Sequence, residues 1–391
     1  MVAKISESIN IFNIGLLFFT SIMKIAIVYD YLNQLGGGER VLGALCRMFP
    51  GAPIYTILYD REKTEGRFEG KKIYTSFLDF NFARNHHRLF IPLMPLGVKS
   101  LDLKEEYDLV ISVGAGYAKG VKYARGVKHI YYCFTPLRYA WNEEYINDKF
   151  GNMFSKALKP LAKPLLHYLR QWDLRTAQKP DKILTLSRFM GDKIKTCYGR
   201  DSEILYPSFD QNFFFYDPKI KKSDYFLAGG RLMYYKRFDL VIEVFNELGW
   251  PLKIAGDGPD YAALKRIVKS PKIEMLGFVS DQELRRLYQE AQALIFPQIE
   301  DFGLVAVEAQ ACGVPVIAFK AGGTLDIIED GKNGLFFEKQ TLEGLIEALQ
   351  RFKATVFDYE YTARSAKRFS YDVFQNNLRD YIGRCLQEKR T

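Results

Sequence analysis

Short apolar runs alternate with amphipathic stretches along the chain from Met23 onward. The runs are continuous and rich in β-branched residues, which is typical of strands buried on both faces of a parallel sheet. The segments between them carry apolar residues at helical spacing. The pattern therefore predicts an α/β fold. The predicted strands are residues 24–31, 54–59, 72–74, 107–113, 181–186, 225–230, 252–255, 293–296 and 314–319.

The strand and helix pattern ends near residue 210 and then begins again, which suggests two domains of ordinary size in 391 residues. We predict a first domain over residues 23–210 and a second over 211–369, followed by a terminal helix within 370–391. Residues 1–22 are interpreted as an N-terminal extension. Their apolar part is too short to span a bilayer, and an interfacial anchor is the alternative.

A strand, loop, helix and second strand follow one another between residues 293 and 319. Glu300 lies in the loop, and Glu308 lies about one turn into the helix that follows. Loops at the carboxyl ends of parallel strands bind ligands, and a helix N-terminus favours anions or hydroxyl groups. The alternative is that Glu308 only complements the helix dipole and that Glu300 is solvated.

Two cations, Arg231 and Lys236, follow the end of the predicted strand 225–230. Arginine binds phosphate as a bidentate donor and lysine as a point charge, so this edge of the sheet could hold a phosphate group. Glycines 36–38 follow the first strand, where they could approach a phosphate closely or simply form a tight turn. Their spacing is not the dinucleotide fingerprint.

Composition narrows the classes of partner and metal. The net charge of +9 favours polyanionic partners, but no nucleic-acid motif accompanies it, so we expect no nucleic acid. Five cysteines without a CxxC pair suit a reducing compartment. Four histidines without ligand-like spacing argue against zinc.

Two stretches interleave basic and apolar residues, 84–99 and 149–179. The first stretch is interpreted as a helix and loop packed on the sheet, and the second as a solvated helix face. The alternative is a surface that meets a membrane or a lipid-linked acceptor. Pro160 and Pro164 are predicted to break any long helix in the second stretch.

The motifs together resemble family 4 of the retaining glycosyltransferases with the GT-B fold. Glu300 and Glu308 are separated by seven residues, with Phe302-Gly303-Leu304 after the first, and Arg231 and Lys236 follow a Gly-Gly pair. The nearest resemblance is to mannosyltransferases of bacterial surface polysaccharides. It implies two Rossmann-like domains that face each other across a cleft.

The resemblance also implies an activity. This is transfer of a hexose, mannose by preference, from a nucleotide diphosphate sugar such as GDP-mannose to a hydroxyl of a growing, lipid-linked glycan, with retention. No metal or other cofactor would be required. The protein would be cytoplasmic, at the inner face of the cytoplasmic membrane in peripheral association with it.

Residue roles follow from the same resemblance. Arg231, Lys236 and Glu300 would be catalytic, with the two cations on the diphosphate and Glu300 on the sugar. Glu308 would accept hydrogen bonds from the ribose. The other residues expected at the donor are Gly37, Gly38, Gly277, Phe278, Asp301, Phe302, Gly303 and Leu304.

Residues 129–141 resemble a family segment that reads Tyr-Cys-His-Thr-Pro, followed by Arg-Tyr and Trp. Phe134 stands where the family has histidine, and phenylalanine can neither donate a hydrogen bond nor carry a proton. Phe134, Thr135 and Arg138 are expected near the acceptor or the sugar. His129 is expected inside the strand, with a structural role.

Two other functions stay open at this point. A sugar-nucleotide epimerase of the same architecture would act on the nucleotide sugar alone. A non-catalytic relative that only binds nucleotide sugars would be consistent with Phe134. The motifs at Glu300–Glu308 and Arg231–Lys236 favour the transferase.

Overall fold

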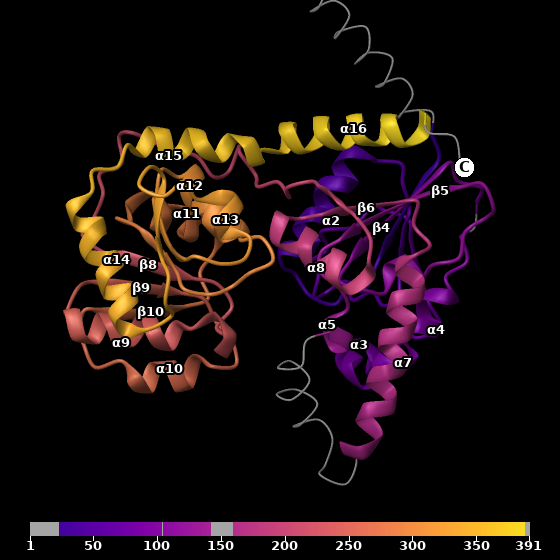
Figure 1. Cartoon of the computed structure of the whole chain (residues 1–391), viewed down its shortest axis with the longest axis horizontal. Helices are drawn as coiled ribbons and strands as arrows, with labels where there is room; N and C mark the ends of the chain where they lie inside the picture. The colour runs from indigo at the N-terminus through magenta and orange to yellow at the C-terminus, as the bar shows by residue number, and fades with distance from the viewer. Residues whose placement is uncertain (1–22, 104, 142–158, 388–391) are drawn as a thin grey trace, which may run out of the picture. The chain divides into compact units, whose positions relative to one another are not determined.

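The computed structural model describes residues 23–103, 105–141 and 159–387. The predicted extension 1–22 lies outside these residues. The chain divides into two compact units (Figure 1). Unit 1 comprises Met1–Tyr206 with Gln375–Thr391, and unit 2 comprises Pro207–Phe374. The sequence had placed these divisions at residues 210 and 369.

Unit 1 contains a seven-stranded parallel sheet, as the continuous apolar runs predicted. The strand order is β3-β2-β1-β4-β5-β6-β7. In its centre, Ile27 of β1 pairs with Ile54 on one side and Ile111 on the other, and all three are buried. The strands are β1 (Ile25–Tyr29), β2 (Ile54–Thr56), β3 (Ile73–Thr75), β4 (Leu109–Gly114), β5 (Lys128–Cys133), β6 (Lys182–Thr185) and β7 (Glu203–Ile204).

Helices connect these strands. They are α2 (Gly37–Met48), α3 (Asn81–Asn85), η1 (His87–Leu93), α4 (Met94–Lys99), η2 (Ala118–Gly120), α5 (Arg138–Trp141), α7 (Lys159–Ala177), α8 (Arg188–Tyr198) and α16 (Tyr371–Gln387), whose last residues belong to unit 1. Ser187 caps α8 by accepting a hydrogen bond from the backbone N–H of Met190.

Helix α7 corrects a prediction, because it continues through Pro164. Pro160 lies in the first turn, where the missing N–H would have had no partner within the helix. Pro164 removes one hydrogen bond, and burial of Leu169 and Asp173 further along holds the helix in place. Packing therefore outweighs the local effect of proline.

Unit 2 contains a six-stranded parallel sheet with the order β10-β9-β8-β11-β12-β13. The strands are β8 (Phe226–Gly229), β9 (Leu252–Ala255), β10 (Ile273–Gly277), β11 (Leu294–Phe296), β12 (Val316–Phe319) and β13 (Gly334–Phe337).

Helices cover both faces of the unit 2 sheet (Figure 1). Helices α9, α10 and α14 pack together on one face, and α11, α12, α13 and α15 lie on the other. Their bounds are η3 (Tyr234–Lys236), α9 (Phe238–Leu248), α10 (Tyr261–Ile267), α11 (Asp281–Glu290), α12 (Leu304–Ala311), α13 (Thr324–Ile327), α14 (Leu342–Ala354), α15 (Tyr359–Ala366) and η4 (Lys367–Phe369).

Each sheet has one switch point. The first strand lies in the middle of the sheet, the next two strands are added on one side of it, and all later strands are added on the other side. The switch point lies between β1 and β4 in unit 1 and between β8 and β11 in unit 2. The loops after these two neighbouring strands diverge, and this leaves a crevice at the carboxyl edge of a parallel sheet. The switch points are therefore where functional residues are expected.

Candidate functional site

Lys236 and Glu300 meet at the switch point of unit 2. Lys236 comes from the loop after β8, and Glu300 from the loop after β11. Lys236 Nζ lies 2.7 Å from Glu300 Oε1, and the two side chains are 11% and 22% exposed. Gln298 Nε2 donates to the same carboxylate oxygen at 3.3 Å. Glu300 is therefore held in an ion pair, and its interpretation as a solvated residue is wrong.

Gly230 makes room for Lys236. Its φ of +129° lies in the region that favours glycine, and a Cβ at this position would lie 3.2 Å from Lys236 Nζ. A Cβ on Gly256, at the end of β9, would collide with the carbonyl of Gly230. Close backbone packing of these two turns places the ammonium group at the sheet edge.

The loop that carries Glu300 is fixed from the neighbouring strand. The backbone N–H of Gly323, after β12, donates to the Glu300 carbonyl at 2.9 Å. A Cβ on Gly322 would lie 2.6 Å from that carbonyl oxygen. Gly303, with φ +115°, then begins α12. This is the helix predicted between the strands 293–296 and 314–319, and it spans Leu304–Ala311.

The other predicted residues of this stretch differ in exposure. Phe302 is buried, and its ring contacts Phe369 edge to face with centroids 5.4 Å apart. Glu308 is 1% exposed on α12, and Asp301 and Leu304 are half-buried. The side chain of Phe302 thus belongs to the core, and a ligand at this loop would meet its backbone instead.

Two further predicted elements lie at the same carboxyl edge of the unit 2 sheet. Arg231 is exposed at the start of the loop after β8. Gly277 ends β10 with φ +71°, and the ring of Phe278 after it is 83% exposed. An exposed ring at the end of a parallel strand could stack on a planar ligand.

In unit 1, Gly38 and Phe134 are brought together. A Cβ on Gly38 would lie 2.5 Å from Tyr29 Oη and 3.0 Å from Phe134 Cε2. Tyr29 Oη donates to Glu39 at 2.9 Å, and burial raises the pKa of Glu39. The first turn of α2, which includes Gly37, thus already holds a buried carboxylate at its positive end.

The remaining predicted residues of unit 1 follow β5. Phe134 is buried against Tyr132, with ring centroids 5.5 Å apart. Thr135 is fully buried, and its Oγ1 has no hydrogen-bond partner among the described residues. Arg138 is exposed and begins α5.

His129 is structural, as predicted. It is buried in β5, and its Nε2 lies 2.6 Å from Ser112 Oγ. Burial lowers the pKa of His129 to about 3, so the imidazole is neutral at ordinary pH.

Asp30, which was not predicted from the sequence, occupies the switch point of unit 1. Its Oδ1 and Oδ2 accept hydrogen bonds from the backbone N–H groups of Ala118 and Ala115, both at 2.6 Å. Burial raises the pKa of Asp30 to about 6, against the lowering effect of those donors. An acidic residue directly after the first strand was the available signal. Gln298, next to Glu300, was also missed.

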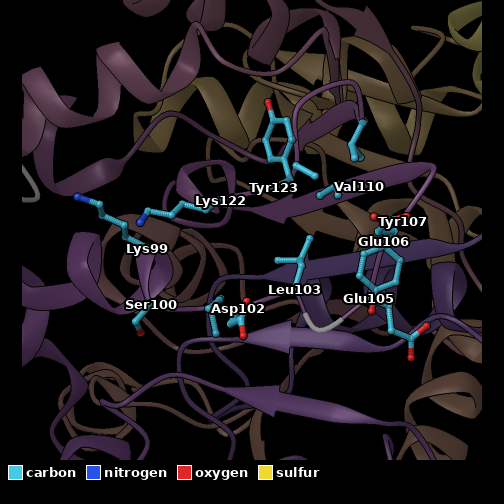
Figure 2. A pocket seen from close by; sticks show the side chains of 13 residues that line it. Lys99, Ser100, Asp102, Leu103, Glu105, Glu106, Tyr107, Val110, Lys122 and Tyr123 are labelled. Atoms are coloured by element: carbon cyan, nitrogen blue, oxygen red, sulfur yellow. The ribbon is translucent and has the colours of Figure 1, made fainter.

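A cavity of about 620 Å³ lies elsewhere in unit 1, where β4 and β5 begin (Figure 2). It is at the opposite edge of the sheet from Gly38 and Phe134, and none of the predicted site residues lines it. Among the described residues, no group of three or more His, Cys, Asp or Glu side chains is arranged to hold a metal ion.

Two family models match consecutive parts of the chain. The model of glycosyl transferases group 1 matches residues 210–368, and that of glycosyltransferase family 4 matches residues 35–213. Together they extend over most of the described chain and meet near the division between the two units.

Curated relatives carry glycosyltransferase names. An uncharacterized glycosyltransferase of Methanocaldococcus jannaschii is 31% identical over 43% of this chain and 48% of its own length. The O-antigen chain mannosyltransferase RfbU of Salmonella typhimurium is 28% identical over 53% of this chain and 60% of its own. The chain thus spans about half of these relatives. The mouse alpha-1,3/1,6-mannosyltransferase ALG2 is 25% identical over 72% of this chain and 74% of its own.

A solved structure with the same fold is that of Anabaena HepE in complex with UDP. It has a TM-score of 0.66 at 16% identity and covers 93% of this chain and 100% of its own. At this identity the likeness concerns the fold, and it agrees with two parallel-sheet α/β units.

Proposed function

Because the chain belongs to family 4 of the GT-B glycosyltransferases, we propose that it transfers a hexose from a nucleotide diphosphate sugar to a hydroxyl of a growing glycan. The observation that carries this proposal is the Lys236–Glu300 pair at the switch point of unit 2. It joins a cation for the diphosphate to a carboxylate for sugar hydroxyls, at the edge where parallel sheets bind ligands.

The leaving group of this reaction is a nucleoside diphosphate, so negative charge develops as the glycosidic bond breaks. Fixed cations stabilise such charge most when they are in place before the reaction. Lys236 is held by Glu300, and its ammonium has further protons to donate to phosphate. Arg231 lies five residues before Lys236, is exposed, and supplies a second, bidentate donor.

The same loops supply contacts for the rest of the donor. Glu300 and the backbone of residues 301–304 bind the sugar hydroxyls. Glu308 binds the ribose, and Gly277 with the exposed ring of Phe278 lies against the base. Gly37 and Gly38 bind the diphosphate in this proposal, although Glu39 already occupies their helix end and weakens the attraction for an anion.

The transfer proceeds with retention and without a metal in this proposal. Glu300 is engaged with Lys236 and serves as a ligand for the sugar, so the acceptor attacks on the same face that the diphosphate leaves. The departing phosphate oxygen accepts the proton of the acceptor hydroxyl. Lys236 and Arg231 stabilise the diphosphate in place of a metal ion.

Mannose is the proposed sugar and GDP-mannose the proposed donor, since two relatives are named mannosyltransferases. The acceptor is a lipid-linked glycan, used at the inner face of the cytoplasmic membrane. No helix among the described residues is long and apolar enough to cross a bilayer. Contact with the membrane is therefore proposed to be peripheral.

The proposal is tested by incubating the full chain with labelled GDP-mannose, with or without EDTA, and with a lipid-linked glycan extract. We expect label in the glycan in an α-linkage, unaffected by EDTA. Lys236→Ala and Arg231→Ala should each lower transfer at least about 100-fold while the protein stays folded.

Other outcomes would contradict the proposal in different ways. A nucleotide sugar that is converted in the absence of acceptor would indicate an epimerase. Near-normal turnover by both variants would remove these cations from the mechanism. Transfer to the acceptor from a UDP-sugar but not from GDP-mannose would support the transferase activity and contradict the proposed donor.

A further inference from the structure

Segment 77–99 of unit 1 exposes an unusual amount of apolar surface. Of the fifteen large apolar side chains that are exposed among the described residues, six lie within residues 77–96. Single exposed apolar residues are ordinary, whereas a group of them marks an interaction site. We call these six residues the apolar patch: Phe77, Phe80, Phe82, Leu89, Leu93 and Leu96.

The apolar patch is separate from the apolar side chains that the helices of this segment bury in the core. Helices α3, η1 and α4 already bury their own apolar residues in the unit 1 core, among them Ala83, Ile91 and Val98. The outward face of such elements is normally polar. Here both faces are apolar, so the outer face is available for a second contact.

Contacts link the segments that carry the patch residues. The ring of Phe90 joins α3 to η1, because it lies edge to face with Phe80 at 5.4 Å and with Phe82 at 6.1 Å between ring centroids. The buried side chain of Leu78 reaches Gly97 of α4, so the segment around Phe77 lies beside that helix.

Positive charge borders the patch. Residues 77–101 contain two arginines, one lysine and a single acid, Asp79, whose carboxylate is paired with Arg84 at 2.7 Å. Leu93, the N-cap of α4, is followed at intervals of three residues by Leu96 and Lys99, and all three are exposed. Lys99 also lies at one end of the cavity in Figure 2, next to Lys122.

The two lysines form a basic end of that cavity. Figure 2 shows Lys99 and Lys122 side by side, with Glu105 and Glu106 at the other end. Both ammonium groups are close enough to Lys179 to lower its pKa, in addition to the larger effect of its burial. A phosphate placed between Lys99 and Lys122 would relieve the repulsion among these cations.

We propose that the apolar patch docks the protein on an anionic membrane surface, with its Phe and Leu side chains in the interface and Lys99 and Lys122 on lipid phosphates. Apolar groups and lysines on one face are the combination that binds anionic bilayers. The two lysines beside the patch, Lys99 and Lys122, favour an anionic lipid surface over a protein partner or a second copy of the chain. Docking there would bring unit 1 to the membrane that holds the lipid-linked acceptor, and in this respect the inference rests on the proposed function.

The test is sedimentation of the full chain with vesicles of phosphatidylcholine alone or of equal parts phosphatidylcholine and phosphatidylglycerol. We expect binding to the anionic vesicles and weakening by added salt. L89S/L96S should weaken binding at least about tenfold, because two interfacial leucines are lost. K99Q/K122Q should weaken it about fivefold for each lysine.

I204S/V356S is the matched control, since it removes two exposed apolar side chains outside the patch and should bind like the wild type. Thermal stabilisation by GDP should be the same in all variants, which separates this inference from the donor site. No binding of the wild type to anionic vesicles would overturn the inference, as would undiminished binding of L89S/L96S. A lipid-free dimer that L89S/L96S dissociates would assign the patch to self-association instead.

Discussion

The two sheets share the topology of their switch points and differ in what occupies them. In unit 1, buried Asp30 bridges to the loop after β4 through two backbone N–H groups. In unit 2, Lys236 and Glu300 remain partly exposed. The acid at the first switch point is buried, whereas the cation at the second stays within reach of solvent. Under the proposed function, the same architecture has a structural role in unit 1 and binds an anion in unit 2.

The N-terminal helix ends differ in the same way. Glu39 is buried in the first turn of α2 beside Gly38 and Tyr29. Helix α12 begins at Gly303 and carries no acidic residue in its first turn. Only the second helix end is open to an anionic or hydroxyl-bearing ligand, and the loop with Glu300 leads into it.

The largest expected effect concerns Asp30. Its pKa rises from an ordinary 3.8 to about 6 in the folded protein. The contribution of a raised carboxyl pKa to stability is fully present below pH 3.8 and is lost as the pH rises to about 6. The wild type therefore loses stability between pH 4 and pH 7, whereas Asp30→Asn has no carboxyl group here to titrate. The free energy of unfolding of Asp30→Asn should lie below that of the wild type, and the difference should shrink by up to about 3 kcal/mol over this range.

Denaturant titrations of wild type and Asp30→Asn across this range measure that narrowing. Asp201→Asn is the control, because the side chain of Asp201 is 91% exposed. If the difference between the two proteins does not change with pH, Asp30 does not titrate between pH 4 and pH 7, and its description as a buried acid with a raised pKa is contradicted.

The next effect compares two glycines of α2. A methyl group on Gly38 meets Tyr29 and Phe134, whereas one on Gly43 meets nothing within 4 Å. Gly38→Ala should lower the free energy of unfolding by about 1–3 kcal/mol. Gly43→Ala should raise it by about 0.5–1 kcal/mol, because alanine favours helix. Equal effects of the two substitutions would show that Gly38 is not packed as described.

The smallest expected effect distinguishes the role of Glu300 in ligand binding from that of Lys236. Glu300→Gln removes the charge that competes with phosphate for Lys236, so GDP should bind as tightly as before or more tightly. GDP-mannose should lose about tenfold of its preference over GDP, since a charged hydrogen-bond acceptor for the sugar is gone. Calorimetric titration with both ligands measures this, and an unchanged preference would remove Glu300 from the sugar site.

Much of this arrangement was predictable from local patterns. Continuous apolar runs predicted most of the strands, and the helix predicted between residues 293 and 319 is α12. The loops with Arg231, Lys236, Glu300 and Phe278 were correctly located at strand ends. Their roles toward a donor stay predictions.

Non-local features were not predictable. The contact between Lys236 and Glu300 depends on β8 and β11 being neighbours, which a strand order decides and a local pattern does not. The burial of Asp30 depends in the same way on β1 and β4. Helix α7 continues past Pro164 because of tertiary packing, which the local propensity of proline could not reveal.

The most direct test of the account is calorimetric titration of the full chain with GDP and with UDP, using two lysine variants. Lys320 pairs with Glu338 at 2.7 Å at the same edge of the unit 2 sheet but away from the switch point. Lys236→Ala should weaken binding of the preferred nucleotide at least about tenfold, and Lys320→Ala should bind like the wild type. Equal affinities for Lys236→Ala and wild type would contradict an anion site at the switch point of unit 2.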